Sequence, residues 1–169
     1  MAYLTALFLS LFATISLIPL LIKFSRRLEV FDIPNARKVH AEPIPRIGGI
    51  AIAIGVFVPL LLWWTTEDTF LRTYTVGAGI IVCFGILDDL KGLDYKLKFL
   101  GQITAALIVV YTGGLKITKL GVLLPDGVVL PVWVSILFTV VLIVGITNAI
   151  NLADGLDGLA GGICLLSFC

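Results

Sequence analysis

The sequence predicts an all-α fold: a polytopic transmembrane helical bundle with five full spans, a truncated sixth span and a short outer β-hairpin. Hydrophobic residues occupy 59% of the 169 positions and charged residues 14%, whereas soluble domains average about 45–50% and about 25%. The mean hydropathy is +1.11, and apolar runs close to the ~20 residues that cross a bilayer recur along the chain. These observations exclude a disordered chain, a secreted disulfide scaffold and a soluble enzyme.

The expected spans, in chain order, are residues 2–22, 47–64, 74–87, 99–112 and 132–150, and a sixth begins near Leu159. The first run is an uncleaved span, because no cation precedes it and it is longer than the apolar stretch of a signal peptide. The third and fourth runs are short, so they cross only if the polar residues at their ends lie near the membrane surface. Residues 115–131 turn at 125–127, which predicts the β-hairpin. The whole chain, 1–169, is a single integral membrane domain.

The distribution of cations sets the expected orientation. Nine of the twelve Lys and Arg residues follow the first and third spans, and three lie in loops on the other side. By the positive-inside rule, the N-terminus is outside and the loops after the first, third and fifth spans are cytoplasmic. A net charge of +1 gives no basic surface, so we expect the lipid bilayer and no nucleic acid as a partner. The three cysteines have no paired spacing, which argues against a disulfide or zinc site.

Carboxylates gather at two of the cytoplasmic span ends. Asp88 and Asp89 end the third span, while Asp154 and Asp157 follow the fifth. Charges at helix ends in a membrane are costly unless they are solvated or paired, so a functional role is the default interpretation. The alternative, favoured for a single acid, is that such residues mark the membrane boundary. Adjacent carboxylates repel each other, which makes that alternative a poor explanation for Asp88 and Asp89.

Asn148, Asn151, Asp154 and Asp157 recur every three residues. If the segment is helical, this spacing places their side chains along one slowly drifting stripe. Carboxylate and amide oxygens are ligands that Mg²⁺ prefers. Without a nearby histidine or paired cysteines, zinc and redox metals are disfavoured. The stripe therefore predicts a magnesium site.

The loop between the first two spans carries a cationic group, Arg37, Lys38, His40 and Arg46. These side chains are candidates for binding phosphate oxygens. Contact with anionic lipid headgroups is the alternative, and we prefer it for Arg26 and Arg27. Three prolines favour a shaped loop, and Gly48-Gly49 would let the second span begin close to a neighbour. Acids with a metal, facing cations across a cytoplasmic surface, are the components that phosphoryl transfer requires.

At these motifs the chain resembles the polyprenyl-phosphate N-acetylhexosamine-1-phosphate transferases of glycosyltransferase family 4. The matching segments are Arg37-Lys38-x-His40 continuing to Pro45-Arg46-x-Gly48-Gly49, Asp88-Asp89 continuing to Lys96-x-Lys98 and Gln102, and Asn148-x-x-Asn151-x-x-Asp154-Gly-x-Asp157-Gly-Leu-Ala. Each segment alone is moderately specific, and three in order across residues 37–160 are strongly specific. The first loop is closer to the branch that uses UDP-N-acetylglucosamine than to the UDP-muramoyl-pentapeptide branch.

The resemblance implies an enzyme, a phosphotransferase of the bacterial plasma (inner) membrane that starts a lipid-linked cell-envelope glycan. Undecaprenyl phosphate would attack the β-phosphorus of UDP-N-acetylglucosamine and release UMP, with Mg²⁺, or alternatively Mn²⁺, stabilising the charge. The implied site has catalytic Asp88, Asp89, Asp154 and Asp157, substrate-binding Arg37, Lys38, His40, Arg46, Lys98 and Asn148, and the metal ligand Asn151. The first acid pair would handle the lipid phosphate or its proton and the second the nucleotide, but the role of each Asp stays open. A homodimer is a candidate assembly.

Two expectations remain, one on the extent of the chain and one on a competing function. Members of the family continue through more spans, with a later Gly-Asp motif and a His-containing loop. We therefore expect an N-terminal fragment that is inactive by itself. The competing function is a membrane transporter or channel subunit whose acids carry cations. That function needs acids near the middle of the membrane, whereas these fall at span ends.

Overall fold

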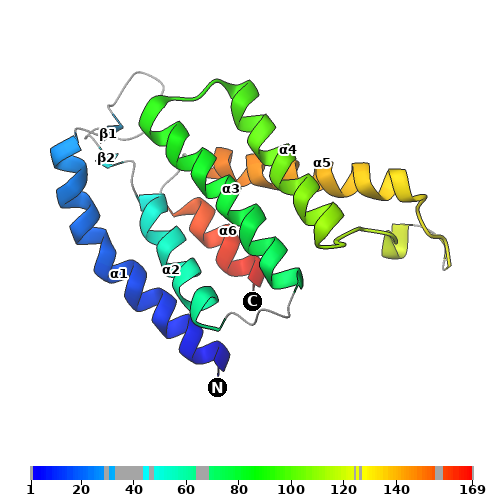
Figure 1. Cartoon of the computed structure of the whole chain (residues 1–169), viewed down its shortest axis with the longest axis horizontal. Coiled ribbons are helices and arrows are strands. Elements are labelled where there is room, and N and C mark those ends of the chain that lie inside the picture. The colour runs from blue at the N-terminus through cyan, green and yellow to red at the C-terminus, as the bar shows by residue number, and fades with distance from the viewer. Residues whose placement is uncertain are drawn as a thin grey trace.

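The structure is a computed structural model that describes residues 2–28, 31–32, 44–45, 48–63, 69–123, 125, 127–154 and 158–168. These residues form six α-helices, α1 (Ala2–Leu28), α2 (Gly48–Leu62), α3 (Thr69–Lys91), α4 (Tyr95–Thr112), α5 (Val132–Ala153) and α6 (Leu159–Phe168), and one short 3-10 helix, η1 (Gly121–Leu123). After α1, the two-residue strands β1 (Phe31–Asp32) and β2 (Ile44–Pro45) pair in antiparallel fashion. Apart from these two short strands, the described elements are all helices, which confirms the predicted all-helical class (Figure 1).

Within the described part of the chain, three helices are long and apolar enough to cross a membrane, namely Tyr3–Arg27 within α1, all of α3 and all of α5. The apolar window of α1 is 0% buried, so its large side chains face outward, as lipid contact requires. The 15 residues of α2 span only about 22 Å, against a hydrocarbon core of about 30 Å. The polar residues of α4 lower its hydropathy. The protein is a membrane protein, but the prediction of five full spans is not confirmed.

The helices continue past the ends of the apolar runs. The third run was expected to end at residue 87, yet α3 continues to Lys91 and carries Asp88 and Asp89 in its last turn. In the same way, α4 begins at Tyr95 and so includes Lys98 in its first turns. Backbone hydrogen bonding can continue a helix through polar residues. A hydropathy profile therefore does not detect where these helices end. The acids and the lysine are therefore held on helices rather than in loops.

Helices that are neighbours in sequence pack against each other from α1 to α5, and α6 contacts α5 (Figure 1). Small residues permit these contacts: a Cβ added at Gly101 of α4 would lie 2.5–2.8 Å from the Phe84 ring of α3. Gly55 of α2 packs in the same way against Thr14 of α1. The close approach expected at Gly48-Gly49 is not found among the described residues, because a Cβ there meets no described atom within 4 Å. Backbone contact between α1 and α2 occurs two turns later.

The segment between α4 and α5 contains η1, and its described residues include no strand. A backbone hydrogen bond joins described residues of its two arms, from Leu130 N–H to Thr118 O at 2.8 Å. Glycines bend it away from extended geometry, with positive φ at Gly114, Gly121 and Gly127. Ile117 is bound to α5 instead: its N–H donates to Thr139 Oγ1 at 2.9 Å, and its carbonyl accepts from Ser135 Oγ at 2.7 Å. The predicted β-hairpin is not confirmed.

Candidate functional site

Asp88 closes the turn between α3 and α4. Its Oδ1 accepts a hydrogen bond from Leu93 N–H at 3.1 Å, and its backbone carbonyl accepts one from Gly92 N–H at 2.8 Å. Gly92 has φ of +62°, a left-handed conformation that ends a helix and favours glycine. Asp88 is therefore fixed in the turn by one hydrogen bond to its side chain and one to its main chain.

The ammonium group of Lys98 bridges two oxygens that belong to different helices. Lys98 Nζ lies 2.6 Å from Oδ2 of Asp88 on α3 and 3.3 Å from Oδ1 of Asn151 on α5. The Lys98 and Asp88 side chains are 25% and 23% exposed, so most of this charged pair is withdrawn from solvent. Charge-assisted hydrogen bonds in such surroundings are stronger than neutral ones. One cation thus joins the ends of α3, α4 and α5.

One helical turn further along α4, a neutral contact joins the same pair of helices. Asn148 Nδ2 on α5 donates to Gln102 Oε1 on α4 at 2.9 Å, and to the carbonyl of Val144 on its own helix at 3.2 Å. Gln102 is buried, with 5% of its surface exposed. Residues three or four apart lie on one helix face. Lys98 and Gln102 therefore face Asn151 and Asn148 as two successive contacts between α4 and α5.

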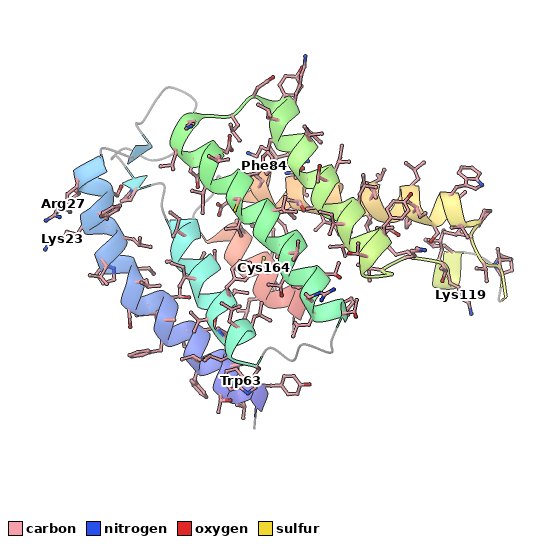
Figure 2. All side chains as sticks on the ribbon, in the orientation of Figure 1. Lys23, Arg27, Trp63, Phe84, Lys119 and Cys164 are labelled. Carbon is pink, nitrogen blue, oxygen red and sulfur yellow. The ribbon has the colours of Figure 1, made fainter. Side chains whose placement is uncertain are left out.

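A pocket of about 480 Å³ adjoins these contacts. Its polar lining consists of Lys98, Gln102, Thr147, Asn151 and Asp154. Its apolar lining comes from α2, α3, α5 and α6 and includes Ile52, Phe84, Ile150 and Cys164. Figure 2 labels Phe84 on α3 and Cys164 on α6, which lies behind α3 in this view. Apolar walls with a few convergent polar groups are typical of sites for small ligands.

The remaining predicted site residues are distributed unevenly. Asp89 lies beside Asp88 in the last turn of α3 and is half-buried. Among the described residues of the predicted stripe, Asn148 and Asn151 lie on α5, which ends at Ala153, and Asp154 follows the helix end, exposed to solvent. Arg37, Lys38, His40, Arg46 and Asp157 lie outside the described residues. Within the described ranges, no three His, Cys, Asp or Glu side chains cluster closely enough to hold a metal ion.

Gln102 is a residue of this site to which the sequence interpretation assigned no role. It was quoted only as part of a matching motif, although a signal was present. A polar amide inside an apolar helix is costly in a membrane unless it finds a partner. The structure supplies that partner in Asn148, which the sequence had placed among the substrate-binding residues.

The described residues form a helical membrane protein with charged and amide side chains gathered at the ends of three helices. The chain matches glycosyl transferase family 4 over residues 71–169, more than half of its length, and it belongs to that family. This confirms the family resemblance that the motifs predicted.

The chain is similar to several named relatives. It is 42% identical to a probable undecaprenyl-phosphate N-acetylglucosaminyl 1-phosphate transferase of Bacillus subtilis (strain 168), covering 95% of this chain and 45% of that protein. It is 38% identical to a decaprenyl-phosphate N-acetylglucosaminephosphotransferase of Mycolicibacterium smegmatis, over 97% of this chain and 42% of the relative. A phospho-N-acetylmuramoyl-pentapeptide-transferase of Desulfotalea psychrophila is 34% identical over 88% and 46%. The chain spans less than half the length of these relatives, and no solved structure matches it.

Proposed function

We propose that the chain acts in the transfer of N-acetylglucosamine-1-phosphate from UDP-N-acetylglucosamine to undecaprenyl phosphate, which starts a lipid-linked cell-envelope glycan. The observation that carries this proposal is the meeting of Asp88, Lys98 and Asn151, from three helices, beside a pocket with apolar walls. The names of two relatives describe N-acetylglucosamine phosphotransfer with undecaprenyl or decaprenyl phosphate. A phosphate on a long apolar chain requires this combination of a fixed cation and an apolar surface.

In the proposed reaction, an oxygen of the lipid phosphate attacks the β-phosphorus of UDP-N-acetylglucosamine. The bond from that phosphorus to the bridging oxygen breaks, and UMP leaves with the electron pair. Negative charge shifts between phosphoryl oxygens, so a preorganised cation stabilises the transition state. Lys98 would bind a phosphate oxygen through its ammonium, while Asp88, and Asn151 before the ion binds, hold that ammonium in place. The lipid phosphate is largely anionic at neutral pH, so the attack requires no general base.

Mg²⁺ is the proposed cofactor, with Mn²⁺ as the alternative. The donor set fits a hard cation, because Asn151 and Asp154 line one pocket and present amide and carboxylate oxygens. Asn151 would hold the ion through its side-chain oxygen, and Asp154 would add a carboxylate. When bound, the ion would neutralise the diphosphate and stabilise the departing UMP. Asp88 is less suited to this role, since Lys98 and Leu93 N–H engage both of its oxygens, at 2.6 Å and 3.1 Å. Asn151 Oδ1 also accepts from Lys98, but at the longer distance of 3.3 Å, and it would exchange this contact for the ion.

We also propose roles for the second acid of each pair and for the cations of the first loop. Asp89 would act on the lipid phosphate and Asp157 on the nucleotide. The loop cations, Arg37, Lys38, His40 and Arg46, would bind phosphate oxygens of the UDP-sugar. We also propose a homodimer, which the mass of the detergent-solubilised protein would test.

The proposed location is the bacterial inner membrane, with the N-terminus outside and the site on the cytoplasmic side. In this arrangement α1 to α5 all cross, because α2 and α4 pack between the three longer helices. α6 then begins a sixth span. The end of α3, the start of α4 and the end of α5 lie at one membrane face, which brings the charged groups together outside the hydrocarbon core.

The test uses residues 1–169 joined to the part of the Bacillus subtilis relative that this chain does not cover. We expect this fusion to transfer labelled N-acetylglucosamine-1-phosphate to undecaprenyl phosphate in the presence of Mg²⁺. Lys98→Gln should reduce the rate by ~10²-fold, the scale of removing one preorganised electrostatic group. Lys96→Gln is the matched control. Lys96 is also a lysine in the first turn of α4, but its Nζ lies over the Tyr95 ring, 5.9 Å from the ring centroid. Equal rates in the two variants would refute the role of Lys98.

Pocket occupancy provides a readout that does not require turnover. Cys164 lines the pocket, whereas Cys83 is exposed on α3. Undecaprenyl phosphate together with UDP-N-acetylglucosamine should slow maleimide labelling of Cys164 and leave Cys83 unaffected. Equal labelling rates of Cys164 with and without these substrates would contradict binding in the pocket.

A further inference from the structure

The two contacts between α4 and α5 differ in chemistry and in burial. The Lys98–Asn151 contact is charged and partly exposed, and its 3.3 Å length is close to the upper limit of a hydrogen bond. The Gln102–Asn148 contact is neutral, shorter at 2.9 Å, and involves the buried Gln102. The buried pair is thus the tighter of the two, and it lies one turn deeper along both helices.

The amide group of Asn148 has no donor capacity left for a substrate. A side-chain amide nitrogen carries two hydrogens. In Asn148 the two acceptors are Gln102 Oε1 and the Val144 carbonyl, so both hydrogens are engaged. Gln102 Oε1 accepts one of these bonds inside the helix contact. The Asn148 amide nitrogen therefore acts on the structure around it rather than on a ligand.

The position of Lys98 depends on how α4 sits against α5. Asp88 holds Lys98 from α3, so the second acceptor, Asn151, stays within reach only if α4 and α5 keep their register. A shift of about 1 Å between these helices would lengthen the 3.3 Å contact beyond hydrogen-bonding distance. The Gln102–Asn148 bond opposes such a shift, because it joins the same two helix faces one turn away.

We propose that Gln102 and Asn148 are positioning residues, which fix the register of α4 against α5 and thereby keep Lys98 within reach of Asn151. The significance of this role for catalysis rests on the proposed function, whereas the geometric role does not. It replaces the direct substrate contact that the sequence predicted for Asn148.

The experiment measures how fast an amine-reactive ester acylates Lys98 in the detergent-solubilised chain, with Lys96 as the internal reference in mass spectrometry. Gln102→Leu and Asn148→Leu should each raise the Lys98 rate relative to Lys96 by about threefold, the scale of one interhelical hydrogen bond in a membrane protein. Exchanging the two amides, with Gln102→Asn and Asn148→Gln together, should restore a rate close to that of the unaltered chain.

A matched control comes from the opposite end of α4. Thr112 Oγ1 lies 3.4 Å from Thr73 Oγ1 of α3, so Thr112→Val removes a polar interhelical contact of the same helix. This variant should leave the relative Lys98 rate unchanged. Asn151→Ala should raise that rate directly, and adding Gln102→Leu to it should give no further increase. Absence of a further increase distinguishes positioning through Asn151 from a general loosening of the fold.

Two results would overturn the proposal. One is an unchanged Lys98 rate in Gln102→Leu when Asn151→Ala raises it. The other is an equal rise from Gln102→Leu in the presence and absence of Asn151. If the expected labelling pattern is obtained but the fusion protein transfers no sugar phosphate, the proposed function fails and the positioning role stands.

Discussion

Replacing Asp88 by Asn separates the two contacts that this side chain makes. The amide oxygen of Asn can still accept the hydrogen bond from Leu93 N–H, but the charge that pairs with Lys98 Nζ at 2.6 Å is lost. A hydrogen bond to a charged group contributes about 1.5–3 kcal/mol to stability. The Asp88 and Lys98 side chains are 23–25% exposed, so solvent screening places the contribution of this pair below the upper end of that range. We expect Asp88→Asn to lower the free energy of unfolding by about 2 kcal/mol. Asp88→Ala should cost about 1 kcal/mol more, because the turn also loses its side-chain acceptor.

A double-mutant cycle with Lys98→Met isolates the ion pair. The free energy of unfolding is measured on the solubilised chain by titration with SDS, followed by tryptophan fluorescence. The coupling energy between Asp88→Asn and Lys98→Met should be about 1–2 kcal/mol, whereas Asp88→Asn and Lys96→Met should be additive. Additivity of the Asp88 and Lys98 substitutions within about 0.5 kcal/mol would refute the view that this pair fastens α3 to α4.

Two further predictions concern helix packing and topology. Gly101→Ala places a Cβ 2.5–2.8 Å from the Phe84 ring and should lower the free energy of unfolding by about 1–3 kcal/mol, while Gly145→Ala, with no described atom within 4 Å, should be nearly neutral. Equal SDS midpoints for these two variants would contradict the packing of α3 on α4. Asp94→Cys, in a chain without its native cysteines, should react with an impermeant maleimide only after cells are permeabilised, since we propose that the turn between α3 and α4 is cytoplasmic. Labelling in intact cells would reverse the proposed orientation.

The structure gives Asp88 two contacts that the sequence did not predict. The motif presents two equivalent acids, and the sequence left their roles open. Asp88 accepts from Leu93 N–H and from Lys98, and these bonds engage both of its oxygens. Asp88 is therefore best understood as the residue that holds the turn and the lysine.

Hydrophobic composition and motif spacing, which are local properties, were sufficient to predict the class of this protein. Apolar runs predicted the order of the helices, because burial in lipid depends on each segment's own side chains. The motifs predicted family membership and selected Asp88, Lys98 and Asn151 as site residues. Helix ends were predicted less well, as at Lys91 and Tyr95, because backbone hydrogen bonding continues beyond the apolar residues.

Only the tertiary structure decided which polar groups meet. Asn148 and Asn151 were predicted on one stripe, but their partners lie on α4, and a partner across a helix contact depends on register and approach distance. That approach is set by small residues such as Gly101, which allows Phe84 to pack directly on α4. The sequence determined that this chain is a helical membrane protein with acids and amides at helix ends. The packing of α3, α4 and α5 decided that Lys98 joins them and that Gln102 is paired, because contacts between distant residues require a fixed arrangement of helices that no local pattern encodes.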